Sequence, residues 1–159
     1  MAVIVLTGAP GVGKTTIVRD VAQKLNERGV RVGGIISREV RTNNVRTGFE
    51  LIDLTTNDRE ILASVTENGP RAANRLINAL INVDIIICDE IGPMELESKE
   101  FIDAARNLIT TDKNVIVVVH QKLEHPLVSE FREKSSSLVS INLRNRNEVS
   151  KILLNRLNV

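Results

Sequence analysis

A glycine-rich segment between an apolar run and an amphipathic run restricts the fold more than any other feature of the sequence. Residues 8–16 read GAPGVGKTT and match the pattern G-x-x-x-x-G-K-[S/T]. The fixed positions of this pattern are Gly8, Gly13, Lys14 and Thr15. An apolar run, Ala2–Leu6, precedes the segment, and helical spacing follows it, so backbone amides and a helix N-terminus can converge on one anion. The segment therefore predicts an α/β fold with a phosphate-binding loop.

The side chains of this loop have distinct expected functions at a bound nucleotide. Lys14 can reach the β and γ phosphates as a point charge, and the Thr15 hydroxyl is the expected direct ligand of Mg²⁺. Thr16 is expected near the α phosphate. The alternative is a glycine-rich turn that only begins a helix, which we disfavour because both the motif and its flanks are satisfied.

Short apolar runs alternate with helical segments along the rest of the chain. The expected strands are Ala2–Leu6, Val30–Ile36, Val83–Cys88, Val115–His120 and Leu138–Leu143. The expected helices are Lys14–Glu27, Arg71–Ile81, Ser98–Thr110, Pro126–Glu133, with His125 at its entry, and Asn147–Leu157. Because the strands are apolar along their length, they suit a mostly parallel, five-stranded sheet covered by helices on both faces. The charged, irregular region from Ser37 to Pro70 is expected to contain a β-hairpin that turns at Asn43–Asn44.

Two adjacent carboxylates, Asp89 and Glu90, follow the third apolar run. An aspartate that ends a buried strand beside a phosphate loop typically holds Mg²⁺, directly or through water. Neighbouring side chains of a strand face opposite sides, so Glu90 would not share this ion unless the strand breaks there. The turn expected at residues 91–93 ends the strand and lets Glu90 reach over the γ phosphate, where it can polarise the attacking water. A solvated charge at a strand end is the alternative for Glu90.

The main predicted site consists of the phosphate loop together with these two carboxylates. The nucleotide-binding residues are Gly8, Ala9, Pro10, Gly11, Val12, Gly13, Lys14, Thr15, Thr16, Asp89 and Glu90. Glu90 and Lys14 are the predicted catalytic residues, and Thr15 and Asp89 are the predicted Mg²⁺ ligands. The histidines lack zinc spacing, so no further metal site is expected.

Additional polar side chains are weaker candidates for phosphate or base contacts. Arg41 and Arg46 flank the expected hairpin turn and can neutralise phosphate charge, or they can simply protect a sheet edge. His120 and Gln121 end the fourth strand, where a γ-phosphate sensor or a plain solvent-facing strand end would lie. The Arg146 guanidinium can stack on the base, whereas its neighbouring asparagines are equally suited to cap a helix.

The composition limits the class of protein and its partners. At 159 residues the chain suits a single domain, residues 1–159, with one core. A net charge of +1 gives no general attraction to nucleic acid or anionic lipid, and three Phe with no Trp or Tyr leave few stacking platforms, so nucleic acid is not indicated. The single cysteine, Cys88, excludes an internal disulfide, and no apolar stretch approaches a membrane span, so a cytoplasmic location is expected. The sequence does not predict an oligomeric state.

Several motifs together resemble the nucleoside-triphosphatase family first described from thermophiles, whose animal members are cancer-related nucleoside-triphosphatases. They are TGAPGVGKTT, S-R-E-V-R followed by R-T-G-F, DEIGPMEL, H-P-L-V near residue 125, and Asn145–Arg146. The resemblance extends over nearly the whole chain. It implies a RecA-like P-loop core with an added β-hairpin and, for the five expected strands, the order 5-1-4-3-2. It also implies slow, Mg²⁺-dependent hydrolysis of ATP, GTP and other nucleoside triphosphates to diphosphate and phosphate.

The residues and the resemblance favour a hydrolase in which Glu90 orients and deprotonates water while the loop, Lys14 and Mg²⁺ neutralise the phosphates. A small-molecule or nucleotide kinase that uses the same phosphate loop is the first alternative. The absence of an obvious arginine-rich lid disfavours it mildly. A nucleotide-gated nucleic-acid-binding protein is the second alternative, and the scarcity of aromatic residues disfavours it.

Overall fold

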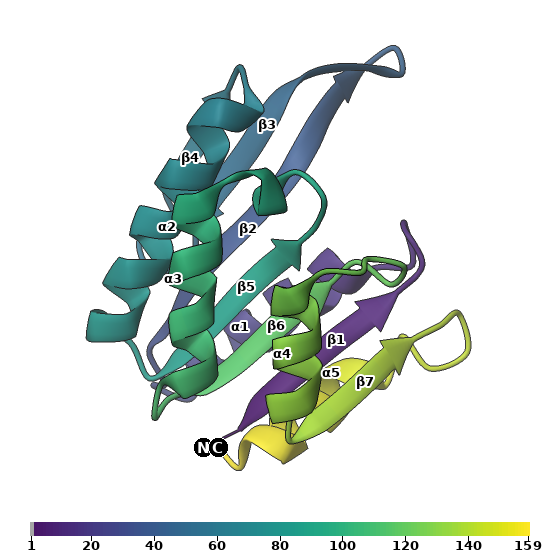
Figure 1. Cartoon of the computed structure of the whole chain (residues 1–159). Helices are drawn as coiled ribbons and strands as arrows, with labels where there is room; N and C mark the ends of the chain where they lie inside the picture. The colour runs from purple at the N-terminus through teal and green to yellow at the C-terminus, as the bar shows by residue number, and fades with distance from the viewer. Residues whose placement is uncertain (1) are drawn as a thin grey trace.

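The computed structural model describes residues 2–159, which form a seven-stranded sheet with helices on both faces (Figure 1). The strands are β1 (Val3–Gly8), β2 (Val32–Thr42), β3 (Val45–Asp53), β4 (Arg59–Leu62), β5 (Ile85–Ile91), β6 (Asn114–Val119) and β7 (Ser137–Ile141). The helices are α1 (Lys14–Glu27), α2 (Val65–Asn82), the 3₁₀ turn η1 (Glu95–Glu97), α3 (Lys99–Thr110), α4 (Pro126–Lys134) and α5 (Val149–Leu157). None of the helices in the described part of the chain has the length and apolarity that a membrane crossing requires.

The sheet has the order β4-β3-β2-β5-β6-β1-β7. The strands from β2 to β7 in this order are all parallel, which confirms the mostly parallel sheet and the order 5-1-4-3-2 for the five expected strands. β3 and β4 then extend the same sheet with antiparallel pairing. The expected hairpin is therefore a continuation of the sheet, and β4 is a further strand that the sequence pattern did not predict.

The β2–β3 hairpin turns at Asn43 and Asn44, as predicted. Both asparagines have positive φ, 53° and 64°, which suits a two-residue turn between twisted antiparallel strands. β2 continues to Thr42, well beyond the predicted end at Ile36, because β3 pairs with its backbone after β5 has ended. The hairpin consequently projects beyond the rest of the sheet.

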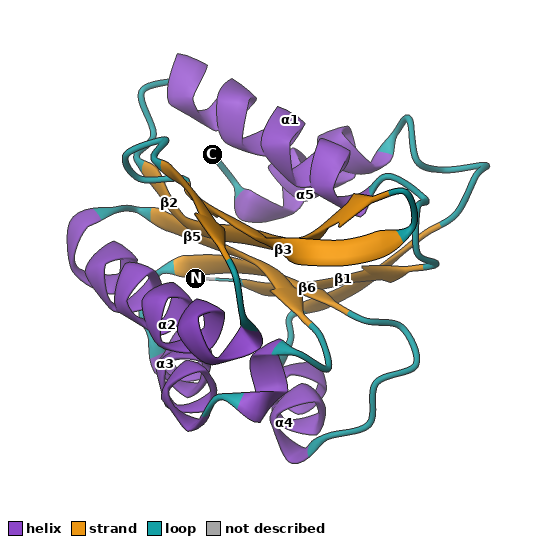
Figure 2. Ribbon diagram, turned by 90° about the horizontal axis from the view of Figure 1, so that it is seen from above, coloured by secondary structure: helices purple, strands orange, loops and turns teal. Residues whose placement is uncertain are grey.

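Alternating residues of the parallel strands face two separate apolar layers. Ile4 and Leu6 pack with residues of α1 and α5, whereas Val3 and Val5 pack with residues of α2, α3 and α4. Figure 2 shows the helices that cover these two layers, with α1 and α5 on one side of the sheet and α2, α3 and α4 on the other. Cys88 lies in the second layer and is fully buried, as its apolar surroundings in the sequence predicted.

The helix boundaries follow local capping chemistry. α2 begins at Val65 and not at the predicted Arg71, because the Ser64 side chain accepts a hydrogen bond from the backbone of Glu67 and caps the helix before Pro70. At the entry of α4, His125 Nδ1 accepts a hydrogen bond from the Leu127 amide at 3.0 Å. The expected helix entry at His125 is therefore confirmed, whereas α2 begins earlier than predicted and contains Pro70.

Candidate active site

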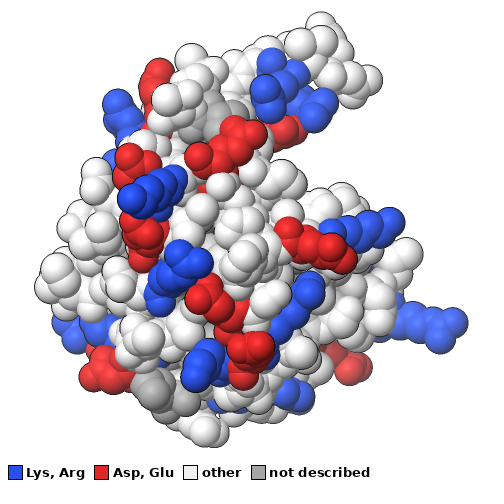
Figure 3. Space-filling view, viewed as in Figure 1, with Lys and Arg blue, Asp and Glu red and all other residues white. Residues whose placement is uncertain are grey.

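A cavity of about 830 Å³ lies at the carboxyl ends of the parallel strands. Its lining comes from the phosphate loop, from the projecting part of β2, from the end of β5 with the turn that follows, and from the residue after β6. In the space-filling view, a hollow separates the β2–β3 hairpin from the body of the molecule (Figure 3). The lining residues are Pro10, Gly11, Gly13, Lys14, Thr15, Thr16, Ser37, Arg38, Glu39, Arg41, Asp89, Glu90, Pro93, Met94, Glu95 and His120.

The phosphate loop connects β1 to α1 in the predicted strand–loop–helix order. Gly13 has φ 108°, a left-handed conformation that favours glycine, and α1 begins at the next residue. Lys14 Nζ donates a hydrogen bond to the carbonyl oxygen of Gly8 at 2.7 Å, so the ammonium group folds across the loop. A Cβ at Gly8 would lie 2.8 Å from the Ile141 carbonyl oxygen, which explains why this position must be glycine where β1 packs against β7.

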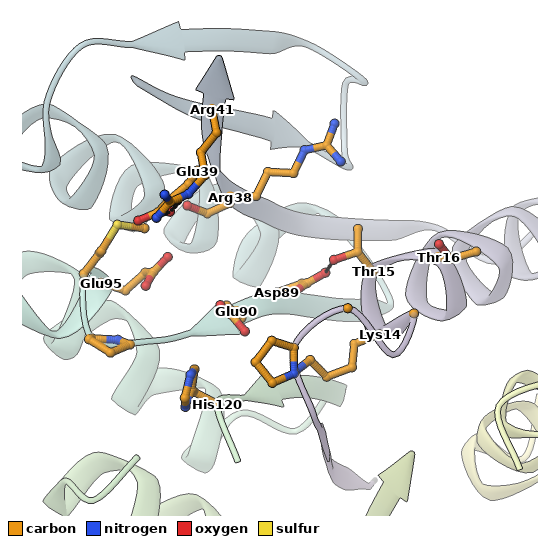
Figure 4. Close-up of a pocket in the computed structure, with 16 residues that line it drawn as sticks. Lys14, Thr15, Thr16, Arg38, Glu39, Arg41, Asp89, Glu90, Glu95 and His120 are labelled. Atoms are coloured by element: carbon orange, nitrogen blue, oxygen red, sulfur yellow. Dashed lines mark hydrogen bonds and ion pairs between the residues drawn. The ribbon is translucent and has the colours of Figure 1, made fainter. Parts of the chain in front are cut away.

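Asp89 and Thr15 meet in the lining of the cavity (Figure 4). The Thr15 hydroxyl donates a hydrogen bond to Asp89 Oδ2 at 2.8 Å, which joins residues that are distant in the sequence. Asp89 is only 2% exposed, and this burial raises the pKa of its carboxyl group to about 7, although the hydrogen bond from Thr15 opposes the shift. A hydroxyl and a buried carboxylate are hard oxygen donors, and a bound cation would compensate the buried charge, so the pair fits Mg²⁺. No cluster of three or more His, Cys, Asp or Glu suited to a metal occurs in residues 2–159, and Mg²⁺ commonly needs only one or two protein ligands beside nucleotide phosphates.

Glu90 is the extra residue of a β-bulge. In the pairing of β5 with β6, Asp89 lies opposite Val118 and Ile91 lies opposite Val119, so Glu90 has no partner. Ile91 consequently packs into the apolar layer with α2, α3 and α4, on the face of the sheet where strict alternation would have placed Glu90. The strand continues to Ile91, beyond the predicted end at Cys88, and the bulge is what releases Glu90 from the alternation and directs it into the cavity.

The hairpin forms the opposite wall of the cavity and carries one of the two candidate arginines. The Arg41 guanidinium lines the cavity and pairs with Glu39, with 2.8 Å between Nη2 and Oε2. Arg46 lies outside the lining, with its guanidinium 5.3 Å from the centre of the Phe49 ring and 3.7 Å from Glu39. The structure thus places Arg41, but not Arg46, in the lining of the cavity that the phosphate loop also lines.

Of the remaining candidates for nucleotide contacts, only His120 lies in the lining of the cavity. His120 lines the cavity, whereas its neighbour Gln121 is exposed and lies outside the lining. Arg146 is also exposed and outside the lining. Asn145 exchanges hydrogen bonds with Asn142 and holds the loop after β7. The N-cap residue that precedes α5 is Glu148, so neither Asn145 nor Asn147 caps this helix. Contacts of Gln121 and Arg146 with a nucleotide remain predictions.

Sequence reasoning missed Glu95, which lines the cavity although it is only 1% exposed. Its Oε2 accepts a hydrogen bond from the Gly92 amide at 3.2 Å. Burial, assisted by the nearby charge of Glu90, raises the pKa of Glu95 to about 7. The available signal was its position between two apolar residues, Met94 and Leu96, where an acidic side chain is unusual.

Comparison with known proteins places the chain in a family. The model of the NTPase family matches residues 3–154. The chain belongs to this family. A nucleoside-triphosphatase THEP1 from Methanopyrus kandleri is 40% identical, over 95% of this chain and 92% of that protein. A nucleoside-triphosphatase THEP1 from Methanosarcina acetivorans is 39% identical, over 96% of this chain and 95% of that protein.

Solved structures of NTPase family relatives share the fold. The crystal structure of THEP1 from the hyperthermophile Aquifex aeolicus superposes with a TM-score of 0.83 at 31% identity, covering 99% of both chains. The solution structure of a human cancer-related nucleoside triphosphatase gives a TM-score of 0.76 at 26% identity, covering 98% of this chain and 97% of the human one. These similarities confirm the resemblance and the P-loop α/β fold that the sequence predicted.

Proposed function

We propose that this member of the NTPase family hydrolyses nucleoside 5′-triphosphates to diphosphate and phosphate in an Mg²⁺-dependent reaction. The observation that carries the proposal is the Thr15–Asp89 hydrogen bond, with the bulged Glu90 directed into the same cavity. The names of the relatives, nucleoside-triphosphatase THEP1, agree with this chemistry. ATP and GTP are the substrates that we would test first.

The phosphate groups are proposed to lie along the loop that precedes α1. Amides of the loop and the N-terminus of α1 face the phosphate oxygens, and Lys14 turns from the Gly8 carbonyl toward the β and γ phosphates. Thr15 and Asp89 would hold Mg²⁺, which supplies charge neutralisation for the β and γ oxygens when it is bound. These contacts hold the γ-phosphorus near Glu90.

Glu90 is proposed as the general base. Its half-buried carboxylate orients a water molecule, accepts one of its protons and leaves the oxygen free to attack the γ-phosphorus in line. The new bond joins the water oxygen to phosphorus, and the bond that breaks joins the γ-phosphorus to the oxygen bridging to the β phosphate. The electrons of that bond leave with the nucleoside diphosphate.

Arg41 and His120 are proposed as further phosphate contacts because both line the cavity. The Arg41 side chain is 55% exposed in its pair with Glu39, and exposed ion pairs are weak, so a triphosphate can compete for the guanidinium. His120 follows β6 and lies on the side of Glu90 that faces away from the hairpin (Figure 4).

Product analysis without an added acceptor tests this proposal. Purified protein is incubated with Mg²⁺ and ATP, GTP, CTP or UTP, and nucleoside diphosphate, monophosphate and free phosphate are resolved. We expect equal amounts of diphosphate and phosphate, and loss of both in Lys14→Ala but not in a control, Lys24→Ala, which changes a lysine on the exposed side of the same helix. Phosphate release only after addition of a second substrate would instead establish a kinase and refute the proposal.

A further inference from the structure

The function proposed above leaves one buried carboxyl group in the described lining of the cavity without an assignment. Glu95 is less exposed than Asp89, at 1% against 2%, yet it is neither a predicted metal ligand nor the predicted base. Its Oε2 accepts a hydrogen bond from the Gly92 amide, but within residues 2–159 its Oε1 is buried without a hydrogen-bond partner. Burial of an incompletely paired carboxyl group is costly. The fold tolerates this cost in the turn that directly follows Glu90.

The carboxyl groups of Glu95 and Glu90 converge on Gly92. A Cβ built on Gly92 would lie 3.0 Å from Glu95 Oε2 and 3.4 Å from Glu90 Oε1, so the two oxygens are no further apart than the sum of these distances. Figure 4 shows the Glu95 carboxyl group directed toward Glu90. The missing side chain of Gly92 leaves the space that both carboxyl groups use.

Two buried polar side chains, Asn68 and Ser37, lie beside Glu95. Asn68, at 1% exposure, donates from Nδ2 to the Ser37 hydroxyl at 3.0 Å. The Ser37 hydroxyl lies near Glu95 and opposes the rise in the pKa of its carboxyl group. The Asn68–Ser37 hydrogen bond links α2 to β2 beside the turn that carries Glu95.

We propose that Glu95 is a positioning residue for Glu90: its buried carboxyl group holds the Gly92 amide and so fixes the bulged segment that directs Glu90 at the phosphate pocket. This inference rests on the proposed function, because it assumes that Glu90 acts on the attacking water. A displacement of about 1 Å in a reacting group can reduce a rate by about a hundredfold. Accurate placement of Glu90 therefore explains why position 95 holds a carboxyl group, although an apolar side chain would cost less free energy to bury there.

The positioning proposal is tested by comparing hydrolysis by Glu95→Gln with hydrolysis by a control, Glu97→Gln. The control changes an exposed residue of the same 3₁₀ turn. Glutamine keeps the shape of Glu95 but has one acceptor oxygen where the carboxyl group has two, so its amide nitrogen must face either the Gly92 amide or the Oε1 site. We expect single-turnover hydrolysis to fall by about 10- to 100-fold in Glu95→Gln. ATP affinity should stay within about threefold, since the phosphates are proposed to lie along the loop before α1 and not against Glu95, and Glu97→Gln should resemble wild type.

Thermal unfolding separates a positioning function from a structural one. At pH 8 without nucleotide, Glu95→Gln should unfold at the same or a higher temperature than wild type, because it removes a buried charge. A purely structural Glu95 predicts the opposite, a lower unfolding temperature with weaker nucleotide binding. If the variant does not fold, Ser37→Ala supplies the second test: slower hydrolysis with retained affinity supports the proposal, and an unchanged hydrolysis rate overturns it.

A double variant distinguishes failure of this inference from failure of the proposed function. When two residues act through one group, their losses do not multiply, so Glu90→Gln/Glu95→Gln should be within about threefold of Glu90→Gln alone. Two results would overturn the positioning proposal only. The first is a double variant whose loss of hydrolysis is the product of the two single losses. The second is hydrolysis by Glu95→Gln within about threefold of wild type while Glu90→Gln is inactive. Normal hydrolysis by Glu90→Gln would refute the assigned base and this inference together.

Discussion

The burial of Asp89 predicts an unusual dependence of stability on pH that Asp89→Asn should remove. Burial raises the pKa of this carboxyl group from 3.8 to about 7 in the folded protein. An acid with a raised folded-state pKa costs no stability below its unfolded-state pKa, and it costs progressively more as the pH rises through the folded-state value. The wild-type protein should therefore lose stability relative to Asp89→Asn between about pH 4 and pH 7, and the loss should level off above pH 7.

The size of this effect follows from the shift. One pKa unit corresponds to about 1.4 kcal/mol, so the free energy of unfolding of Asp89→Asn relative to wild type should rise by about 2–3 kcal/mol from pH 5 to pH 8. Asparagine keeps an acceptor oxygen for the Thr15 hydroxyl, so little of this difference should come from a lost hydrogen bond. The effect applies to the free protein, because a bound cation would stabilise the charged carboxylate.

Urea unfolding in EDTA at pH 5, 6, 7 and 8 measures this difference directly. Asp103→Asn, at an exposed position of α3, is the matched control and should run parallel to wild type. When Mg²⁺ and nucleotide replace EDTA, wild type should gain more stability than Asp89→Asn, because only the carboxylate holds the cation well. The interpretation of Asp89 as a buried, metal-facing carboxylate would be refuted by one result: a difference in free energy of unfolding between Asp89→Asn and wild type that changes by less than about 0.5 kcal/mol from pH 5 to pH 8.

Three other changes test separate parts of the structure. Lys14→Ala should weaken triphosphate affinity and hydrolysis together, and unchanged affinity in calorimetry would contradict the phosphate-loop assignment. Gly34→Ala should cost at least about 2 kcal/mol in urea unfolding, because its φ is 113° and a Cβ would overlap a carbonyl oxygen of β5; Gly29→Ala, with φ 79° and open space, should cost only about 1 kcal/mol. Glu39→Gln should free Arg41 and tighten ATP binding about two- to fivefold at low salt, with no such gain in an Arg41→Ala background.

The sequence predicted those features of the site that depend on local chemistry. The strand–loop–helix at residues 3–27 follows from a continuous apolar run, glycine conformation and helical spacing within one short segment. The turn at Asn43 and Asn44 is equally local, since both residues tolerate positive φ. The order of the sheet, by contrast, came from the family resemblance, because apolar runs do not state which strand lies beside which.

Features that depend on tertiary pairing were not predicted. The bulge at Glu90 is a register shift against β6, and no property of residues 85–91 alone requires it. Glu95 resembles an ordinary loop charge until the packing of α2, β2 and η1 encloses it. The start of α2 lies before the predicted Arg71 because the Ser64 cap begins the helix at Val65 and Pro70 is accommodated inside it.

The central claim is that Glu90 is the base that activates water, and Glu90→Gln tests it most directly. Glutamine keeps the shape and hydrogen-bonding reach of the side chain but cannot take the proton. Single-turnover ATP hydrolysis should fall by about 10²–10⁴ relative to wild type and to the exposed control Glu97→Gln. Equilibrium ATP binding should be retained or tightened, because a negative charge near the γ phosphate is removed. Hydrolysis within about threefold of wild type would contradict the claim, since a missing base costs far more.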